Sequence, residues 1–274
     1  MKIRKREEIR LVAEHATLGV LVLMASVIGL VLWYIAQVRR GREYYVRRIA
    51  GIDAIDEAVG RSVELGRPIS YSSGLTSVSP VLYACMGILY HIARKVARLK
   101  VALLLPQNDA QVMAVAEDTT KDAFRAENRL NAYEPKNMRF LSDEQFAFAA
   151  GYSGMVQREN VGAAFLFGAF AGESLILAEA GQQIGAMQVA GSISPEQVAF
   201  FVCTCDYTLI GEELFAASAY LTREPVQLGS LLGQDRAKLL FLSIILIGIL
   251  IATINQFLKV PIANIDSLIL YQAW

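Results

Sequence analysis

Thr17–Ala36 reads TLGVLVLMASVIGLVLWYIA, and Leu239–Leu258 reads LLFLSIILIGILIATINQFL. Neither stretch contains a charged residue, and each is about 30 Å long as an α-helix, the thickness of the hydrocarbon core of a bilayer. Two such stretches at opposite ends of a chain seldom fit into one soluble core. The sequence therefore predicts transmembrane helices over residues 17–37 and 239–258.

The surroundings of these two helices indicate a retained anchor rather than a cleaved signal peptide. The first stretch is longer than the apolar part of a signal peptide, about 7–15 residues, and arginines follow it instead of a cleavage site. Ala25 and Gly29, like Gly248 and Ala252, are small residues four positions apart, a spacing that lets helix backbones approach closely. A basic segment, residues 1–16, precedes the first helix. An apolar tail, residues 259–274, follows the second, and we expect it to lie in the membrane interface or to dock onto a neighbour.

Two spans place both termini on one side of a membrane and the middle of the chain on the other. Near the spans, the middle side carries eight lysine and arginine residues and the terminal side six. Because Lys and Arg are enriched in cytoplasmic segments, this excess favours a cytoplasmic middle domain. The cysteines agree with that side, since Cys203 and Cys205 are too close for a usual structural disulfide and Cys85 falls in a predicted helix.

The middle segment, residues 41–237, alternates between predicted strands and helices. Its VALLL run, for example, is continuously apolar, as is typical of a strand covered on both faces. Because strands that alternate with helices form parallel sheets through right-handed crossovers, we expect one Rossmann-like α/β domain: a mostly parallel sheet of about five strands with helices on both faces. The predicted strands are Ile69–Ser72, Val101–Leu105, Met138–Leu141, Val161–Phe167 and Ala186–Ala190, and Val198–Thr208 is compatible with either strand or helix.

The charge of the chain limits its partners. Lys plus Arg and Asp plus Glu both number 26, so the net charge is zero, and a nucleic-acid partner, which needs a basic surplus, is not expected. From Glu159 to Thr222 there is no Lys or Arg. This tract predicts either the core of a tight sheet or a subunit interface, whose centre is typically poor in charge and rich in aromatic residues.

The sequence lacks the common catalytic and metal-binding patterns. It has two histidines and three cysteines, and no Walker A, HExxH, GxSxG or GxGxxG pattern occurs. Cys203 and Cys205 have no further Cys or His nearby to complete four metal ligands. We therefore expect no metal site, no cofactor and no enzymatic activity.

Two glycine-containing loops form the candidate binding crevice. Each follows a predicted strand and precedes a helix, the position at which parallel sheets bind ligands and helix N-terminal amides face an anion. Glu173 in the second loop would repel a phosphate, and glycines also serve plain tight turns. The candidate residues are Gly74, Thr76 and Ser77 in the first loop and Gly168, Gly172 and Ser174 in the second.

Three strings of the middle segment are similar to those of a known family: GIDAIDEAVGRSVELGRPI, FGAFAGESLILAEAG and CDYTLIGEELFAASAYLTREPVQLGSLLGQD. Over most of residues 45–237 the chain resembles an uncharacterised family of bacterial two-pass membrane proteins, defined only as a domain of unknown function. The resemblance implies a setting in the bacterial inner (cytoplasmic) membrane. It implies no activity, cofactor or functional residue.

These observations leave two hypotheses. The first is a membrane-anchored structural or assembly subunit, non-catalytic, that lies in the lipid bilayer and forms homo-oligomers or joins a larger membrane protein complex. The alternative is a membrane-tethered sensory domain that binds a small ligand or nucleotide in the crevice near Gly74 and Gly168.

Overall fold

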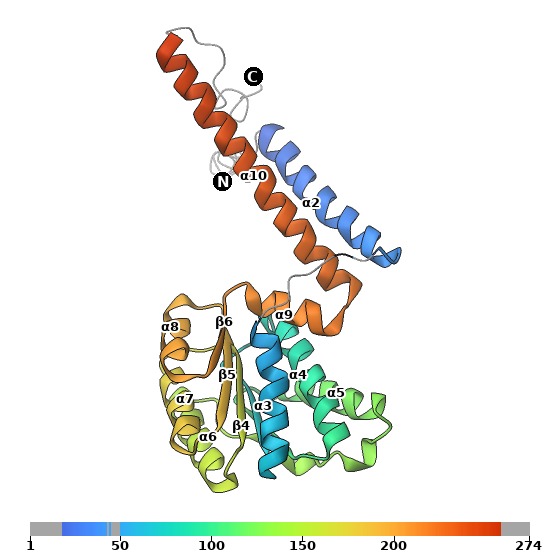
Figure 1. Ribbon diagram of the computed structural model, residues 1–274, viewed down its shortest axis with the longest axis vertical. Helices are drawn as coiled ribbons and strands as arrows, with labels where there is room; N and C mark the ends of the chain where they lie inside the picture. Colours follow the sequence, from blue (N-terminus) through green and yellow to red (C-terminus); the bar gives the residue numbers. More distant parts are fainter. Residues whose placement is uncertain (1–17, 43, 45–49, 259–274) are drawn as a thin grey trace, which may run out of the picture. The chain divides into compact units, whose positions relative to one another are not determined.

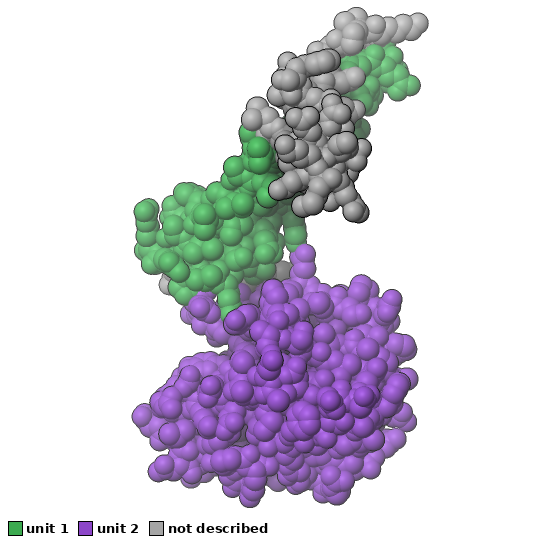
Figure 2. Space-filling view, turned by 180° about the vertical axis from the view of Figure 1, so that it is seen from behind, with its two compact units in different colours: residues 1–44, 225–274 green, residues 45–224 purple. Residues whose placement is uncertain are grey.

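A computed structural model of the chain describes residues 18–42, 44 and 50–258, and it divides into two compact units (Figure 2). One unit combines the two ends of the chain, Met1–Tyr44 and Pro225–Trp274, and the other is Tyr45–Glu224. The predicted basic segment, residues 1–16, and the predicted tail, residues 259–274, lie outside the described residues.

The unit Tyr45–Glu224 is a three-layer α/β sandwich. Its sheet has six strands in the order β3-β2-β1-β4-β5-β6, and every pair is parallel. The strands are β1 Ile69–Gly74, β2 Leu103–Gln107, β3 Met138–Phe140, β4 Ala163–Ala169, β5 Met187–Ser192 and β6 Tyr207–Ile210. The helices are α3 Ala50–Leu65, α4 Pro80–Leu99, α5 Ala110–Ala126, α6 Gln145–Glu159, α7 Ser174–Gln183, α8 Pro195–Thr204 and α9 Glu213–Thr222, with short 3₁₀ turns η1 Leu130–Ala132 and η2 Pro135–Asn137 before β3.

Helices cover both faces of the sheet, with α3, α4, α5 and α9 on one side and α6, α7 and α8 on the other (Figure 1). The central strands are therefore buried on both faces, which explains the apolar sequence of β4, whereas β1 and β5 also carry buried serine and glutamine side chains. Tyr71, Phe165 and Phe167 pack in the core of the first face, and Phe148 and Tyr152 in the core of the second. The predicted Rossmann-like α/β fold is confirmed.

The sheet has six strands where the sequence predicted about five. The ambiguous segment Val198–Thr208 divides between the end of α8 and the start of β6. The Asp206 carboxylate accepts a hydrogen bond from the Gln188 backbone N–H (2.7 Å), and this contact holds the start of β6 beside β5. The sixth strand therefore depends on a long-range contact that local sequence does not reveal.

The other unit is built from α2, Leu18–Arg39, and α10, Pro225–Leu258, two helices long and apolar enough to cross a membrane. The long helix begins at Pro225, so residues 225–237, which the sequence analysis assigned to the middle domain, extend α10. A Cβ built on Gly229 would lie 2.5 Å from the Ile35 Cα, and one on Gly233 would lie 2.7 Å from the Val31 Cα. The two helices are thus antiparallel and in backbone contact.

The glycines that bring α2 and α10 together are not the pair expected on α2. Gly229 and Gly233 are four positions apart and buried against α2. Gly29, by contrast, has nothing within 4 Å of a built Cβ, and Ala25 is exposed beside it. The small residues of α2 therefore face away from α10, because the contact falls on the opposite side of the helix.

Candidate functional site

The two candidate loops meet at the centre of the sheet. β1 and β4 are neighbours, and from them the chain continues to β2 on one side and β5 on the other. The carboxyl ends of such strands form the crevice in which open α/β sheets bind ligands. The structure thus places the predicted loop residues at the topological switch point of this sheet.

Thr76 links the two loops. Its hydroxyl donates to the Ser73 carbonyl (2.5 Å) and accepts from the Ala169 backbone N–H (2.7 Å), and Leu75 N–H donates to the Ala169 carbonyl (2.9 Å). A Cβ on Gly168 would collide with the Ser73 carbonyl and the Thr76 hydroxyl, so only glycine permits this approach. The glycine serves close backbone contact between the two strands.

Side chains of the protein occupy the rest of the crevice. Gly74 has φ +60°, and a Cβ built on it would lie 2.5 Å from the Phe170 ring. Glu173 is fully buried and accepts from the Ala171 backbone N–H (3.0 and 3.1 Å) and from Gln145 Nε2 (2.7 Å). The loop before α7 therefore holds a buried carboxylate of the chain itself, and its negative charge disfavours an external anion there.

The remaining candidates separate into two kinds. Ser174 is buried, and its hydroxyl donates to Gln197 Oε1 (2.5 Å), so it joins α7 to α8. Ser77 and Gly172 are exposed. Of the six predicted residues, the structure brings Gly74, Thr76 and Gly168 into one contact network.

Sequence analysis missed the buried polar groups next to this network. The Ser73 hydroxyl donates to Gln107 Oε1 (2.8 Å) at the end of β2. Gln107 Nε2 and Asn108 Oδ1 are buried without a hydrogen-bond partner in the described part of the chain. The available signal was the polar run that follows the apolar part of β2, PQND, together with the serines of β1.

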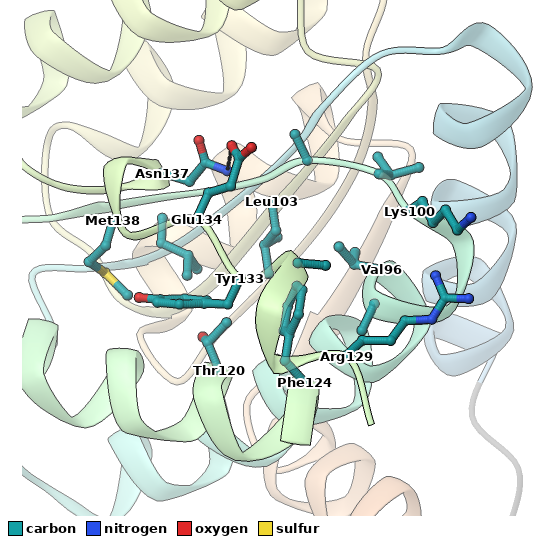
Figure 3. Close-up of a pocket in the computed structure, with 15 residues that line it drawn as sticks. Val96, Lys100, Leu103, Thr120, Phe124, Arg129, Tyr133, Glu134, Asn137 and Met138 are labelled. Carbon is teal, nitrogen blue, oxygen red and sulfur yellow. Dashed lines mark hydrogen bonds between the residues drawn. The ribbon is translucent and has the colours of Figure 1, made fainter. Parts of the chain in front are cut away.

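A separate cavity of about 320 Å³ lies between α4, α5 and the starts of β2 and β3 (Figure 3). Leu103 and Met138 are the first residues of their strands, so the cavity opens at the amino ends, away from the candidate loops. Its volume is at the lower end of the range of small-molecule sites, about 300–1,000 Å³.

The tract without Lys or Arg, Glu159–Thr222, supplies both core and surface. Strands β4 and β5 are buried almost throughout. On the edge strand β6 and the neighbouring α8, however, several large apolar side chains are exposed. We call these side chains at the β6 edge of the sheet the α8–β6 patch, which takes in both faces of β6 and the loop before α8: Ile193, Phe200, Val202, Tyr207 and Ile210, which are 37–57% exposed.

The cysteines do not form a reactive or metal-binding cluster. Cys85, Cys203 and Cys205 are free, and burial raises the pKa of Cys205 to about 12, so its thiol stays protonated at neutral pH. Within the described ranges, no group of three or more His, Cys, Asp or Glu side chains is placed to hold a metal ion.

Comparison with known proteins gives a family. A model described as "Domain of unknown function (DUF6754)" matches residues 10–263. The chain belongs to this family. No curated protein and no solved structure matches the chain. The match covers the apolar helices as well as the α/β unit, which agrees with the resemblance seen in the sequence.

Proposed function

We propose that this DUF6754 protein is a non-catalytic, membrane-anchored assembly subunit that forms homo-oligomers or joins a larger membrane complex, with its α/β unit in the bacterial cytoplasm. The observation that carries the proposal is the large apolar surface of its two terminal helices. Side chains such as Leu21, Leu32, Leu242 and Leu250 are 52–60% exposed. Exposing a contiguous apolar surface of this kind to water is unfavourable, whereas contact with lipid or with a protein partner buries it.

The register of the two helices supports a protein partner in addition to lipid. The contacts of Gly229 with Ile35 and of Gly233 with Val31 set Asp235 and Arg236 level with the middle of the apolar stretch of α2. In this register the centres of the two apolar stretches are offset by about 11 residues, or about 16 Å. When one apolar stretch is centred in the bilayer, the centre of the other therefore lies about 16 Å from the bilayer midplane.

The offset has an energetic consequence. A charged side chain at the centre of a bilayer costs about 2.5–3.5 kcal/mol, so centring α2 would carry Asp235 and Arg236 into an unfavourable position. Centring α10 instead leaves part of the exposed α2 face, including Ile28 and Leu32, outside the hydrocarbon. Protein contacts would cover that face, which favours an assembly over a lone anchor.

The α8–β6 patch supports assembly through the α/β unit. It combines an edge strand with exposed aromatic and branched side chains, and it lies in the tract without Lys or Arg. Natural proteins usually protect exposed edge strands with charge, and interface centres are depleted of lysine. We place the contact between copies at this patch.

The test is the mass of the full chain in a mild detergent. We expect an oligomer, and we expect the double variant Phe200→Lys with Ile210→Lys to reduce it toward the monomer mass. Tyr83→Lys, which changes an aromatic residue on α4 that is 67% exposed, is the matched control and should not change the mass. A monomeric wild-type chain with no co-purifying protein would contradict the proposal.

A second candidate function rests on the unpartnered Gln107 Nε2 and Asn108 Oδ1 at the carboxyl end of β2, beside the switch point. Buried polar groups without partners are unfavourable, and a small ligand bound there would satisfy them. A rise in melting temperature with a nucleotide or small metabolite, lost in Gln107→Leu, would favour this sensory function. An unchanged melting temperature across a nucleotide panel would count against it.

A further inference from the structure

The cavity beside β2 and β3 has the character of a small-molecule site rather than of a packing defect. Its inner wall is apolar and formed by well-packed residues: Val96, Leu103 and Phe124 are all at least 94% buried. The Tyr133 ring closes it with an edge contact to Phe124, with ring centroids 5.9 Å apart at 75°. The wall therefore suits an apolar or aromatic group of modest size.

Two cations meet at one end of this cavity. Lys100 follows the last turn of α4, and Arg129 lies on the loop before η1; both line the cavity on the same side (Figure 3). Neither has a carboxylate within 4 Å among the described residues. Two like charges at one opening favour an anion between them.

The acidic side chains near this cavity are already engaged. Glu134, which lines it, is paired with Lys136 (3.2 Å) and accepts a hydrogen bond from Asn137 Nδ2 (3.3 Å). Glu127 is 12% exposed and accepts hydrogen bonds from Arg94 Nε and Arg98 Nε, both at 2.6 Å. These two arginines neutralise Glu127 and leave an excess of positive charge at this end of the cavity. Lys100 and Arg129 are therefore available to an external anion.

The backbone at Lys100 ends α4 in the left-handed conformation, as the backbone at Arg223 ends α9. Lys100 has φ +60° and ψ +40°, the left-handed conformation that glycine usually supplies after a helix. A residue with a Cβ is less stable there than glycine.

The opposite end of the cavity carries a hydroxyl group. In Figure 3 the Tyr133 oxygen lies away from Lys100 and Arg129, toward Met138. This oxygen is buried, and the Glu117 carboxylate lies next to it as an acceptor. Burial and the carboxylates of Glu117 and Asp118 raise the pKa of Tyr133 to about 12, so the phenol remains a neutral donor.

We propose that this cavity binds a small amphipathic carboxylate, with the carboxylate between Lys100 and Arg129 and an aromatic or branched apolar body against Leu103 and Phe124. Charge-assisted hydrogen bonds from the two cations supply orientation, and burial of the apolar body supplies affinity. The cavity is too small for a whole phospholipid, so the ligand is a free acid. This site does not depend on the assembly proposed above.

The experiment measures binding of 3-phenylpropanoate to the full chain in lipid nanodiscs by isothermal titration calorimetry. The uncharged amide and the corresponding ammonium compound share the same apolar body and serve as ligand controls. We expect binding of the carboxylate, at least tenfold weaker binding of the amide, and no measurable binding of the cation.

Variants of the protein locate the site. Lys100→Gln and Arg129→Gln should each weaken binding at least tenfold, whereas Arg61→Gln, which removes an exposed cation of α3 away from the cavity, should leave it unchanged. Equal affinity for acid and amide, full affinity in both cavity variants, or no binding of the acid would overturn the proposal. The mass of the assembly in detergent is measured separately, so the binding proposal and the assembly proposal can fail independently.

Discussion

Thr76 is the residue on which the junction between β1 and β4 depends most directly. Its hydroxyl bridges the Ser73 carbonyl and the Ala169 N–H, both of which are close to the centre of the sheet. A backbone N–H left buried without a partner costs about 1–3 kcal/mol. Replacing the Thr76 hydroxyl by a methyl group of similar size therefore destabilises the fold, because the Ala169 N–H loses its acceptor.

We expect Thr76→Val to lower the free energy of unfolding by about 1–3 kcal/mol, because it removes both hydrogen bonds while preserving the shape of the side chain. Urea denaturation of the full chain in detergent, followed by circular dichroism, measures this change. Thr76→Ser keeps the hydroxyl and should recover most of the loss. Equal stability of the valine and serine variants would show that the hydroxyl does not hold the loops together.

Glu127 predicts a pH dependence of stability. Hydrogen bonding to Arg98, with a further contribution from Arg94, lowers the pKa of Glu127 from its usual value of 4.5 to about 2. Its stabilising contribution is therefore complete above about pH 4.5 and is lost as the pH falls toward 2. In Glu127→Gln the difference in unfolding free energy from the wild type should shrink over this pH window.

The measurement is urea denaturation of both chains at several pH values between about 5 and 2, the interval set by the two pKa values. Glu64→Gln, which changes an exposed carboxylate of α3, is the control variant. A constant difference between wild type and Glu127→Gln across this range would contradict the role assigned to the two arginines.

The sequence located part of the candidate site and missed the rest for a physical reason. Gly74 and Gly168 could be predicted because each follows a predicted strand and precedes a helix. The pairing of Thr76 with Ala169 could not, because the two residues are 93 positions apart. The surroundings of Gln107 and of the cavity residue Arg129 likewise form only when elements distant in the chain pack together.

Two glycines within helices separate the effect of helix–helix packing on stability from the effect of helix propensity. Gly87 on α4 lies against α9, where a Cβ would come within 2.9 Å of Thr222 Cγ2 and even closer to the Ser218 hydroxyl. Gly60 on α3 has nothing within 4 Å of a built Cβ. The two positions have the same residue type and the same backbone, but opposite surroundings.

Gly60→Ala should raise the free energy of unfolding by about 0.5–1 kcal/mol, because alanine is the better helix former. Gly87→Ala should lower it by about 1–3 kcal/mol, because the added methyl group forces α4 and α9 apart. Urea denaturation of the full chain measures both. Stabilisation by both variants would mean that α4 and α9 do not approach as closely as described.

The extent to which an element could be predicted depends on how much of it is fixed locally. β1, β4 and β5 are strand segments bounded by turn residues, and their positions followed from the sequence. β6 has only four residues and lies at the edge of the sheet, so its conformation depends on pairing with β5. For the same reason the packing role of Gly229 and Gly233 could not be predicted, because their partner helix is distant in the chain.

For the whole molecule, the exposed apolar face of α10 predicts how the chain partitions between membrane and soluble fractions. Leu246 is 58% exposed and lies within the uncharged stretch. Leu246→Arg should reduce the fraction retained in membranes after alkaline extraction, because arginine at mid-helix disfavours insertion by about 2.5–3.5 kcal/mol. Leu246→Ala should leave retention close to that of the wild type. Unchanged retention of the arginine variant would indicate that α10 does not enter lipid.

The antiparallel pairing of α2 with α10 has a consequence for biosynthesis. The ribosome makes α2 first, and roughly 185 residues separate it from the helix that covers its Val31 and Ile35 side; at about 5–20 residues per second this interval is roughly ten to forty seconds. Throughout that time the Val31 and Ile35 side of α2 lacks its partner helix, and the central pairing of the sheet awaits β4. Gly229 and Gly233 therefore reach α2 only after the whole α/β unit has been made.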